Sequence, residues 1–211
     1  MLSEPMPDFA GKPEHTLPAS PIAGLSTIDL TPRFAPLLQK FFNDNPAYFL
    51  ATSGAPASPD AAWEEITEPV PAEFSYTKKW VVGYIDTKGS LAAMANIITD
   101  LPVTAVFHVG TFIVATAHHG KVLAQTLYRG LESWAVGNGA AWMRLGVVEG
   151  NIRAERFWVS QGFIPVRRRS GILMGARSVT VQAMFKPLAA GTLEQYLALV
   201  ARDRSDDVKA P

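Results

Sequence analysis

The sequence contains no cysteine and no excess of charge of either sign. Without cysteine the chain can form no disulfide, use no thiol nucleophile and hold no cysteine-ligated zinc ion. The 19 basic residues are balanced by 19 acidic residues, so the protein has no overall field that would hold a polyanion. These absences exclude small disulfide-rich proteins and cysteine enzymes, and we expect no nucleic-acid partner.

Long hydrophobic runs are also absent. No apolar stretch approaches the ~20 residues that a helix needs to cross a bilayer, and residues 1–15 lack a basic leader followed by an apolar segment. We therefore expect a cytoplasmic protein without a membrane partner. Hydrophobic residues nevertheless make up 48% of the 211 residues, which is enough for the core of one domain.

Proline is concentrated near the start of the chain. Residues 1–24 hold five prolines and few large aliphatic side chains, a composition that does not maintain a regular element. This predicts a flexible proline-rich extension over 1–24, a single domain over 25–188, and a C-terminal helix and tail over 189–211. The last helix is expected over Thr192–Ala201, with fraying of the charged residues after Val200.

Helix and strand patterns alternate between these two tails. Thr31–Pro32 and Ser58–Pro59 each place a capping residue before a proline, which predicts a helix start. Gly110 interrupts an apolar, β-rich run over 103–117, and a glycine there indicates a bulge. Further strands are expected at 25–30, 80–85, 91–98, 142–148, 163–166 and 179–185, and further helices at 120–137 and 151–161. The order predicts one domain of mixed α and β structure, α+β or α/β.

The junction between a strand at Phe112–Val114 and a helix that opens at Gly120 is the most informative segment. A strand that leads into a helix start presents unpaired N–H groups and the positive end of the helix dipole, which suits a diphosphate. Every β-to-α connection exposes such groups, so the junction alone also fits a site that binds nothing. A Walker loop is excluded by Ala115 and Val122, and the dinucleotide pattern GxGxxG is absent.

Two runs of sequence, Val114–Leu127 and Arg144–Phe163, resemble the core motifs of the GNAT superfamily of acyl-CoA-dependent N-acetyltransferases. The first family motif, Arg/Gln-x-x-Gly-x-Gly/Ala, falls on His119–Ala124. The second, Asn-x-x-Ala-x-x followed by an aromatic pair and Gly-Phe, begins at Asn151 and ends at Phe163. The expected element order from Leu25 to Phe185 agrees with that family as well.

The resemblance implies a mostly antiparallel, twisted sheet of about six or seven strands, splayed in the middle and flanked by helices. The strand at Phe112–Val114 would part from that at Leu145–Val147 and pair with the pantetheine arm of acetyl-CoA as an added strand would. The pyrophosphate would rest on the amides that follow Gly120, and an amine would attack the thioester directly in a ternary complex. The implied cofactor-binding residues are Phe112, Ile113, Val114, His119, Gly120, Lys121, Val122, Leu123, Ala124, Asn151, Ala154, Phe157 and Trp158.

Three positions depart from the family pattern. His119 and Val122 replace the usual Arg or Gln and the first usual Gly, and a valine Cβ can crowd a pyrophosphate. Trp158 stands where many members carry a tyrosine that protonates the leaving thiolate, and an indole N–H cannot deliver a proton at neutral pH. The acid must therefore come from elsewhere, most simply from water, or the protein does not catalyse transfer.

The remaining candidate residues concern the base and the acceptor amine. His108 is the first choice for the base, because histidine titrates in the useful range, and Glu149 is the second. Each has a structural alternative, as a hydrogen-bonded core histidine and as part of a turn. The expected acceptor-binding residues are Tyr48, Phe49 and Trp63. The pair His118–His119 lacks further ligands, so no metal is expected, and the basic triplet 167–169 is interpreted as a solvated turn.

These observations predict an N-acetyltransferase that transfers an acetyl group from acetyl-CoA to a primary amine of a small molecule or peptide. The alternative, suggested by Val122 and Trp158, is a GNAT-like module that binds acyl-CoA without turnover, as a sensor or a structural ligand. A protein-binding scaffold without any nucleotide is a third hypothesis. The sequence leaves the acceptor, the acyl-chain preference and a homodimer open.

Overall fold

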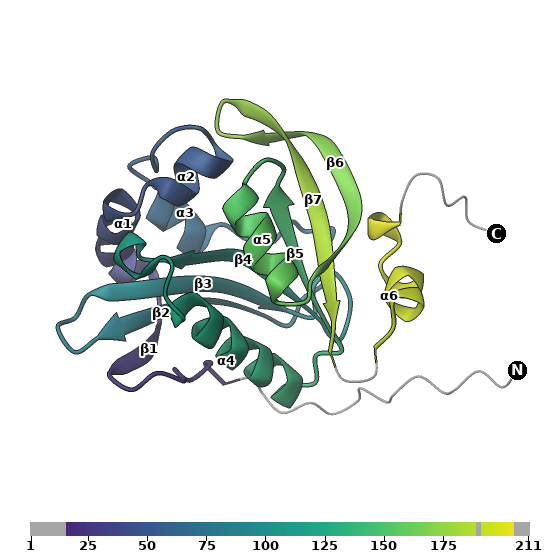
Figure 1. The fold of residues 1–211 in the computed structure, drawn as a ribbon, viewed down its shortest axis with the longest axis horizontal. Coiled ribbons are helices and arrows are strands. Elements are labelled where there is room, and N and C mark those ends of the chain that lie inside the picture. The colour runs from purple at the N-terminus through teal and green to yellow at the C-terminus, as the bar shows by residue number, and fades with distance from the viewer. Residues whose placement is uncertain (1–15, 189–190, 205–211) are drawn as a thin grey trace, which may run out of the picture.

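A seven-stranded sheet forms the centre of the computed structural model, which describes residues 16–188 and 191–204 (Figure 1). The strand order is β1-β2-β3-β4-β5-β7-β6, and all neighbours are antiparallel except β4 and β5. The predicted fold class, a mostly antiparallel α+β sheet of six or seven strands, is confirmed. The strands are β1 Leu25–Asp29, β2 Lys78–Asp86, β3 Leu91–Thr99, β4 Val106–Val114, β5 Trp142–Val148, β6 Ile164–Met174 and β7 Arg177–Pro187.

Helices cover both faces of the sheet. Apolar side chains of α1 and α3 pack with Val81, Met94 and Ile113 on one face, and those of α4 and α5 pack with alternate strand residues on the other. The helix α2 directly follows Pro46 and is not among the helices predicted from the sequence. The helices are α1 Ala35–Asp44, α2 Ala47–Thr52, α3 Ala61–Thr67, α4 Leu123–Gly137, α5 Ile152–Ser160 and α6 Leu193–Leu199.

The strands β4 and β5 run parallel and then part. Their pairing extends from Val106 opposite Trp142 to Val109 opposite Leu145 and no further, whereas β5 stays paired with β7 along its whole length. The parting begins at Gly110, where the register with β3 shifts by one residue. The predicted bulge at Gly110 is confirmed, and the splay implied by the family resemblance begins just after Leu145.

Both predicted tails differ from expectation in the part that the structure describes. Residues 16–24 are not a loose extension, because Trp134 Nε1 on α4 donates to the carbonyl oxygen of Thr16 at 2.8 Å and Pro21 lies directly against Gly130. The fraying predicted after Val200 is wrong for residues 201–204, because Asp203 is fully buried. Residues 1–15 and 205–211 of the predicted tails lie outside the described residues.

The basic triplet 167–169 lies inside β6 and not in a turn. Arg168 forms an ion pair with Glu149 at 2.6 Å, and Arg169 reaches Asp203 on the opposite side at 3.5 Å. Successive side chains of a strand point to opposite faces, so the neighbouring arginines meet different carboxylates. The interpretation as a solvated turn is therefore wrong. No helix among the described residues is long and apolar enough to span a membrane.

Candidate active site

A cavity of about 460 Å³ opens where β4 parts from β5. We call it the splay pocket; its walls are the end of β4, the segment before α4, and α5, and residues of α2 close one side. All of the predicted cofactor-binding residues except Leu123 line it. The side chain of Leu123 instead packs against the core beneath α4. The residues in the pocket are Phe112, Ile113, Val114, His119, Gly120, Lys121, Val122, Ala124, Asn151, Ala154, Phe157 and Trp158.

The start of α4 supplies hydrogen-bond donors to the splay pocket. Gly120 has a φ of 72°, a conformation that glycine adopts without strain, and Val122 precedes the first helical residue without any side-chain cap. Within the described chain, the amides of residues 122–124 donate to no protein acceptor. Lys121 and Arg153 line the same pocket, so free amides and cations converge as an anion requires. The sequence analysis missed Arg153, although it is a basic residue in the first turn of α5.

His119 is part of the wall of the splay pocket. Its Nε2 bonds to the carbonyl oxygen of Val114 at 2.9 Å, and its Nδ1 lies 2.8 Å from Arg153 Nη1. Since a guanidinium can only donate, Nδ1 is the acceptor and Nε2 carries the proton. The histidine therefore ties the end of β4 to the start of α5.

Aromatic rings close the apolar end of the splay pocket. Trp158 is only 7% exposed, and its ring centroid lies 5.8 Å from that of Phe112 and 5.3 Å from that of Tyr128. At the position where many GNAT members carry a tyrosine, Trp158 is therefore a packing residue of the aromatic cluster. Asn151 has two compatible roles, because its side chain accepts from the Ala154 amide at 3.3 Å while the residue also lines the pocket.

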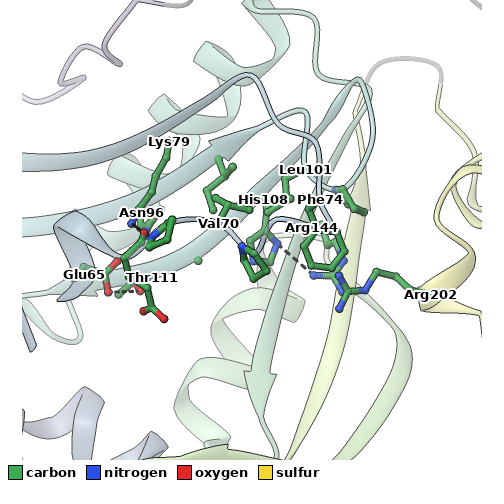
Figure 2. Close-up of a pocket in the computed structure, with 16 residues that line it drawn as sticks. Glu65, Val70, Phe74, Lys79, Asn96, Leu101, His108, Thr111, Arg144 and Arg202 are labelled. Atoms are coloured by element: carbon green, nitrogen blue, oxygen red, sulfur yellow. Dashed lines mark hydrogen bonds between the residues drawn. The ribbon is translucent and has the colours of Figure 1, made fainter.

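A second cavity, of about 380 Å³, lies beneath α3 (Figure 2). We call it the α3 pocket; residues of α3, β3, β4 and the segment after α6 line it. Gly110 and Thr111 border the α3 pocket, and the next residues of β4, Phe112 to Val114, border the splay pocket. The two cavities therefore follow one another along β4, one on each side of the step from Thr111 to Phe112.

Glu65 lines the α3 pocket beside Thr111, the last residue of β4 that borders this cavity. Asn96 Nδ2 donates to one carboxylate oxygen at 2.6 Å and the Thr111 hydroxyl donates to the other at 3.1 Å. Burial raises the pKa of Glu65 above its ordinary value, an effect that these hydrogen bonds and Lys79 oppose and that Glu68 reinforces. The sequence analysis missed this residue. Its signal is helical spacing, because Glu65 lies on the same face of α3 as the core-facing Ala62 and Ile66.

His108 also lines the α3 pocket, but its chemistry differs from the expectation. Arg144 Nη1 lies 3.3 Å from His108 Nδ1, which must accept. Burial, and then the charge of Arg144, lower the pKa of His108 to about 3. The imidazole is therefore neutral and too weakly basic to hold a proton from an ammonium, which argues against the predicted role as base.

Glu149, the second predicted base, lines neither pocket. Its carboxylate pairs with Arg168 on the outer part of the sheet, which removes the reason for choosing it. Of the predicted acceptor-binding residues, Tyr48 lines the splay pocket. Phe49 instead packs against Phe42, with centroids 4.8 Å apart, and Trp63 is 53% exposed on the outer side of α3. Phe49 and Trp63 border neither cavity, so their assignment is corrected.

The acetyltransferase (GNAT) family model matches residues 38–163. Because this match spans more than half of the sequence, the chain belongs to the acetyltransferase (GNAT) family. No curated protein matches the sequence.

Solved structures share the fold at low sequence identity. The acetyltransferase from Thermus thermophilus superposes with a TM-score of 0.57 at 19% identity, over 78% of this chain and 97% of that chain. The ribosomal-protein-S18-alanine N-acetyltransferase from Escherichia coli gives 0.58 at 15% identity, over 80% and 97%. The spermidine N-acetyltransferase from Vibrio cholerae, crystallised with CoA and spermine, gives 0.59 at 15% identity, over 79% and 96%.

Proposed function

We infer that this protein is an N-acetyltransferase that uses acetyl-CoA as co-substrate and acetylates a primary amine in a ternary complex. The observation that carries the inference is the succession of two cavities along β4. One cavity has the anion-binding features of a nucleotide site, and the other presents a carboxylate, Glu65, which accepts from Thr111 on β4. Two of the similar structures support this inference, because their names describe acetylation of amines. One is a spermidine N-acetyltransferase and the other a ribosomal-protein-S18-alanine N-acetyltransferase.

The residues of the splay pocket fit acetyl-CoA. The amides at the start of α4, with Lys121 and Arg153, would hold the pyrophosphate. The unpaired edge of β4 beyond Val109 would accept the pantetheine amides as a neighbouring strand. A backbone N–H at the bulge would stabilise the oxyanion that forms during attack.

Glu65 is the residue that we assign as the base. A protonated amine cannot attack a thioester, so its proton must first leave. That proton goes to Glu65, directly or through one water. The nitrogen then forms a bond with the carbonyl carbon, the carbon–sulfur bond breaks, and CoA leaves as a thiolate. The amide nitrogen gives up its second proton, which passes through water to the group that protonates the thiolate and so restores it.

Tyr48 is the residue that we assign as the proton donor to this thiolate. It lines the splay pocket. Burial and the charge of Glu65 raise its pKa to about 12, partly offset by its hydrogen bond with Thr111, so the phenol is protonated at neutral pH. When Glu65 takes up the amine proton, its charge disappears and the phenol becomes a better donor. Tyr48 would thus replace the tyrosine that Trp158 displaces.

Two measurements test the proposed function. Acetyl-CoA should raise the melting temperature of the protein, because a ligand that binds only the folded state stabilises it. Release of free CoA thiol should then depend on an added amine. Tight acetyl-CoA binding without thiol release from any amine would favour the alternative of a non-catalytic module, and no stabilisation at millimolar acetyl-CoA would contradict both. The cytoplasmic location remains part of this proposal.

A further inference from the structure

The α3 pocket has the carboxylate of Glu65 near one end and arginines near the other. Glu68 and Lys79 line it as well, and Lys79 Nζ donates to the carbonyl oxygen of Glu68 at 2.7 Å. Glu65 and Asn96 lie together at one end, and Arg202 lies at the other, with His108 and Arg144 between them (Figure 2). These residues come from α3, β3, β4, β5 and the short 3-10 turn Ala201–Asp203. A cavity of about 380 Å³ lies within the range of small-molecule sites.

The end near the bulge offers hydrogen-bond acceptors. Asn96 is 8% exposed, its Nδ2 is used on Glu65, and its Oδ1 has no partner in the part of the chain that the structure describes. A buried acceptor without a partner is costly, and an incoming N–H group would satisfy it. With the Glu65 carboxylate beside it, this end is suited to an amine or ammonium group.

The opposite end offers positive charge. Arg144 is compensated, because its Nε and Nη2 each donate to Asp203 at 2.7 Å. Arg202 is held differently: its guanidinium lies 4.3 Å from the centre of the Phe74 ring, and among the described residues no side-chain carboxylate forms an ion pair with it within 4.0 Å. The charge of Asp203 acts on Arg202 but also on Arg144 and Arg169. The exposed Glu73 is a further and weaker negative charge near Arg202.

The middle of the pocket is compatible with a short chain. His108, neutral and with Nδ1 occupied by Arg144, retains Nε2–H as a donor. Val70, Phe74 and Leu101 provide apolar walls. Thr111 lies three positions after His108 on β4, which corresponds to roughly 10 Å of strand. An amine bound at Glu65 can therefore carry a second group several bonds away.

We propose that the acceptor bound in the α3 pocket carries an anionic group, a carboxylate or a similar anion, several bonds from its amine, with the amine at Glu65 and Asn96 and the anion at Arg202. This assignment of substrate class rests on the proposed function. Acceptors of this class include ω-amino acids and short peptides with a free terminus. Polyamines, which are cationic at both ends, would place an ammonium group against Arg202 and are excluded.

Matched acceptors test the substrate class. With acetyl-CoA saturating, thiol release is measured for ω-aminohexanoate, hexylamine and diaminohexane, which share one chain length and differ only in the terminal group. We expect kcat/KM for aminohexanoate to exceed that for the other two by about tenfold or more, the size of one charge-assisted hydrogen bond. Equal or better turnover of hexylamine or diaminohexane would overturn the proposal.

A pair of arginine variants locates the effect. Arg202→Met keeps an apolar side chain on Phe74 but removes the charge, so the ratio of kcat/KM for aminohexanoate to that for hexylamine should fall to about one. Arg33→Met is the control, because Arg33 also lies over a phenylalanine, Phe34 at 4.7 Å, but lines neither pocket. A preference that survives in Arg202→Met, or one that Arg33→Met also loses, would contradict the assignment.

A binding measurement separates this inference from the proposed function. Calorimetric titration of the protein, in the presence of CoA, with aminohexanoate and with hexylamine requires no turnover. Wild-type protein should bind aminohexanoate about tenfold more tightly, and Arg202→Met should bind both equally. If CoA binds and this difference is seen without thiol release, the proposed activity is wrong and the anion site stands. If thiol is released from amines but no difference in binding is found, the anion site is wrong and the activity stands.

Discussion

At the scale of the residue, Glu65, which we propose as the base, has surroundings whose effects on its pKa oppose one another. Burial favours the protonated carboxyl, while Asn96 and Thr111 donate to the charged form. A base with a raised pKa keeps an abstracted proton better than an exposed carboxylate does. The motif residues of the splay pocket could be predicted from the sequence. The pKa of Glu65 could not, because it depends on Asn96 and Thr111, which only the fold brings to this carboxylate.

The variant Glu65→Gln tests the role as base. The amide has nearly the same shape and still accepts from Asn96 or Thr111, but it cannot take a proton. We expect kcat to fall by about 10²–10⁴ with little change in acetyl-CoA affinity. Glu64→Gln, on the exposed side of the same helix turn, is the matched control and should retain full activity. Retention of activity in Glu65→Gln would exclude the assignment.

The raised pKa of Glu65 also predicts a link between pH and stability. For a carboxyl whose pKa is higher in the folded than in the unfolded state, the stabilising contribution is fully present below the ordinary value of 4.5 and is lost as pH rises through the raised pKa. Glu65→Gln should therefore melt at the same temperature as wild type or above it at neutral pH, with the difference closing below about pH 4. A lower melting temperature at neutral pH would indicate that the ionised carboxylate stabilises the fold.

Tyr48→Phe removes only the hydroxyl group that faces Glu65 and Thr111. If this phenol donates to the leaving thiolate, kcat should fall by about 10²-fold while acetyl-CoA still binds. The comparison is Trp158→Phe, which should leave the pH profile of turnover unchanged because the indole is a packing residue. Loss of the alkaline limb in Trp158→Phe, with normal turnover in Tyr48→Phe, would reverse the two roles.

At the scale of the element, the start of α4 is the segment that we propose binds the pyrophosphate of the cofactor. Val122 is 74% exposed, and the neighbouring amides donate to no acceptor in the part of the chain that the structure describes. Val122→Gly should tighten CoA binding if the side chain crowds the pyrophosphate. Calorimetric titration with CoA measures this directly. Unchanged or weaker affinity would show that the valine is accommodated.

Elements with local signals could be predicted, and those that depend on distant partners could not. The 3-10 turn that begins at Pro32 and leads into α1, the start of α3 two residues after Pro59, the bulge at Gly110 and the end of α4 near Gly137 all have a cause within a few residues of sequence. The hairpin β6–β7 is longer than predicted because its outer half is stabilised by pairing between the two strands rather than by an apolar pattern. The helix α2 is a short segment, Ala47–Thr52, with too few turns for an amphipathic period.

At the scale of the whole molecule, the two cavities differ in how the chain builds them. The splay pocket is formed mainly by two contiguous motifs, so a resemblance could identify its lining. The α3 pocket combines Glu65, Asn96, Thr111 and Arg202, which are scattered across the sequence. Their spacing has no pattern, and only the packing of the last described turn against β4 and β5 places Arg202 near the others.

The interaction that holds this last turn in place is the network around Asp203. Its carboxylate is fully buried, accepts two hydrogen bonds from Arg144, and accepts a third from the Tyr196 hydroxyl at 2.5 Å. Against the effect of burial, Arg144 and Tyr196 hold the pKa of Asp203 below its usual value. Stability from this group is therefore present above the ordinary pKa of 3.8 and is lost as pH falls through the lower folded value.

Asp203→Asn should destabilise the whole fold, because it leaves the buried guanidinium of Arg144 without its counter-charge. Removing one partner of a buried ion pair costs about 3–5 kcal/mol, which denaturant unfolding at neutral pH measures. The difference from wild type should shrink as pH falls from about 3.8 through the lower folded pKa of Asp203, because the wild-type carboxyl then also loses its charge. Asp44→Asn, in the exposed pair of Lys40 and Asp44, is the control and should cost less than about 1 kcal/mol. Equal effects of the two substitutions would show that the last turn is held by apolar contacts rather than by charge.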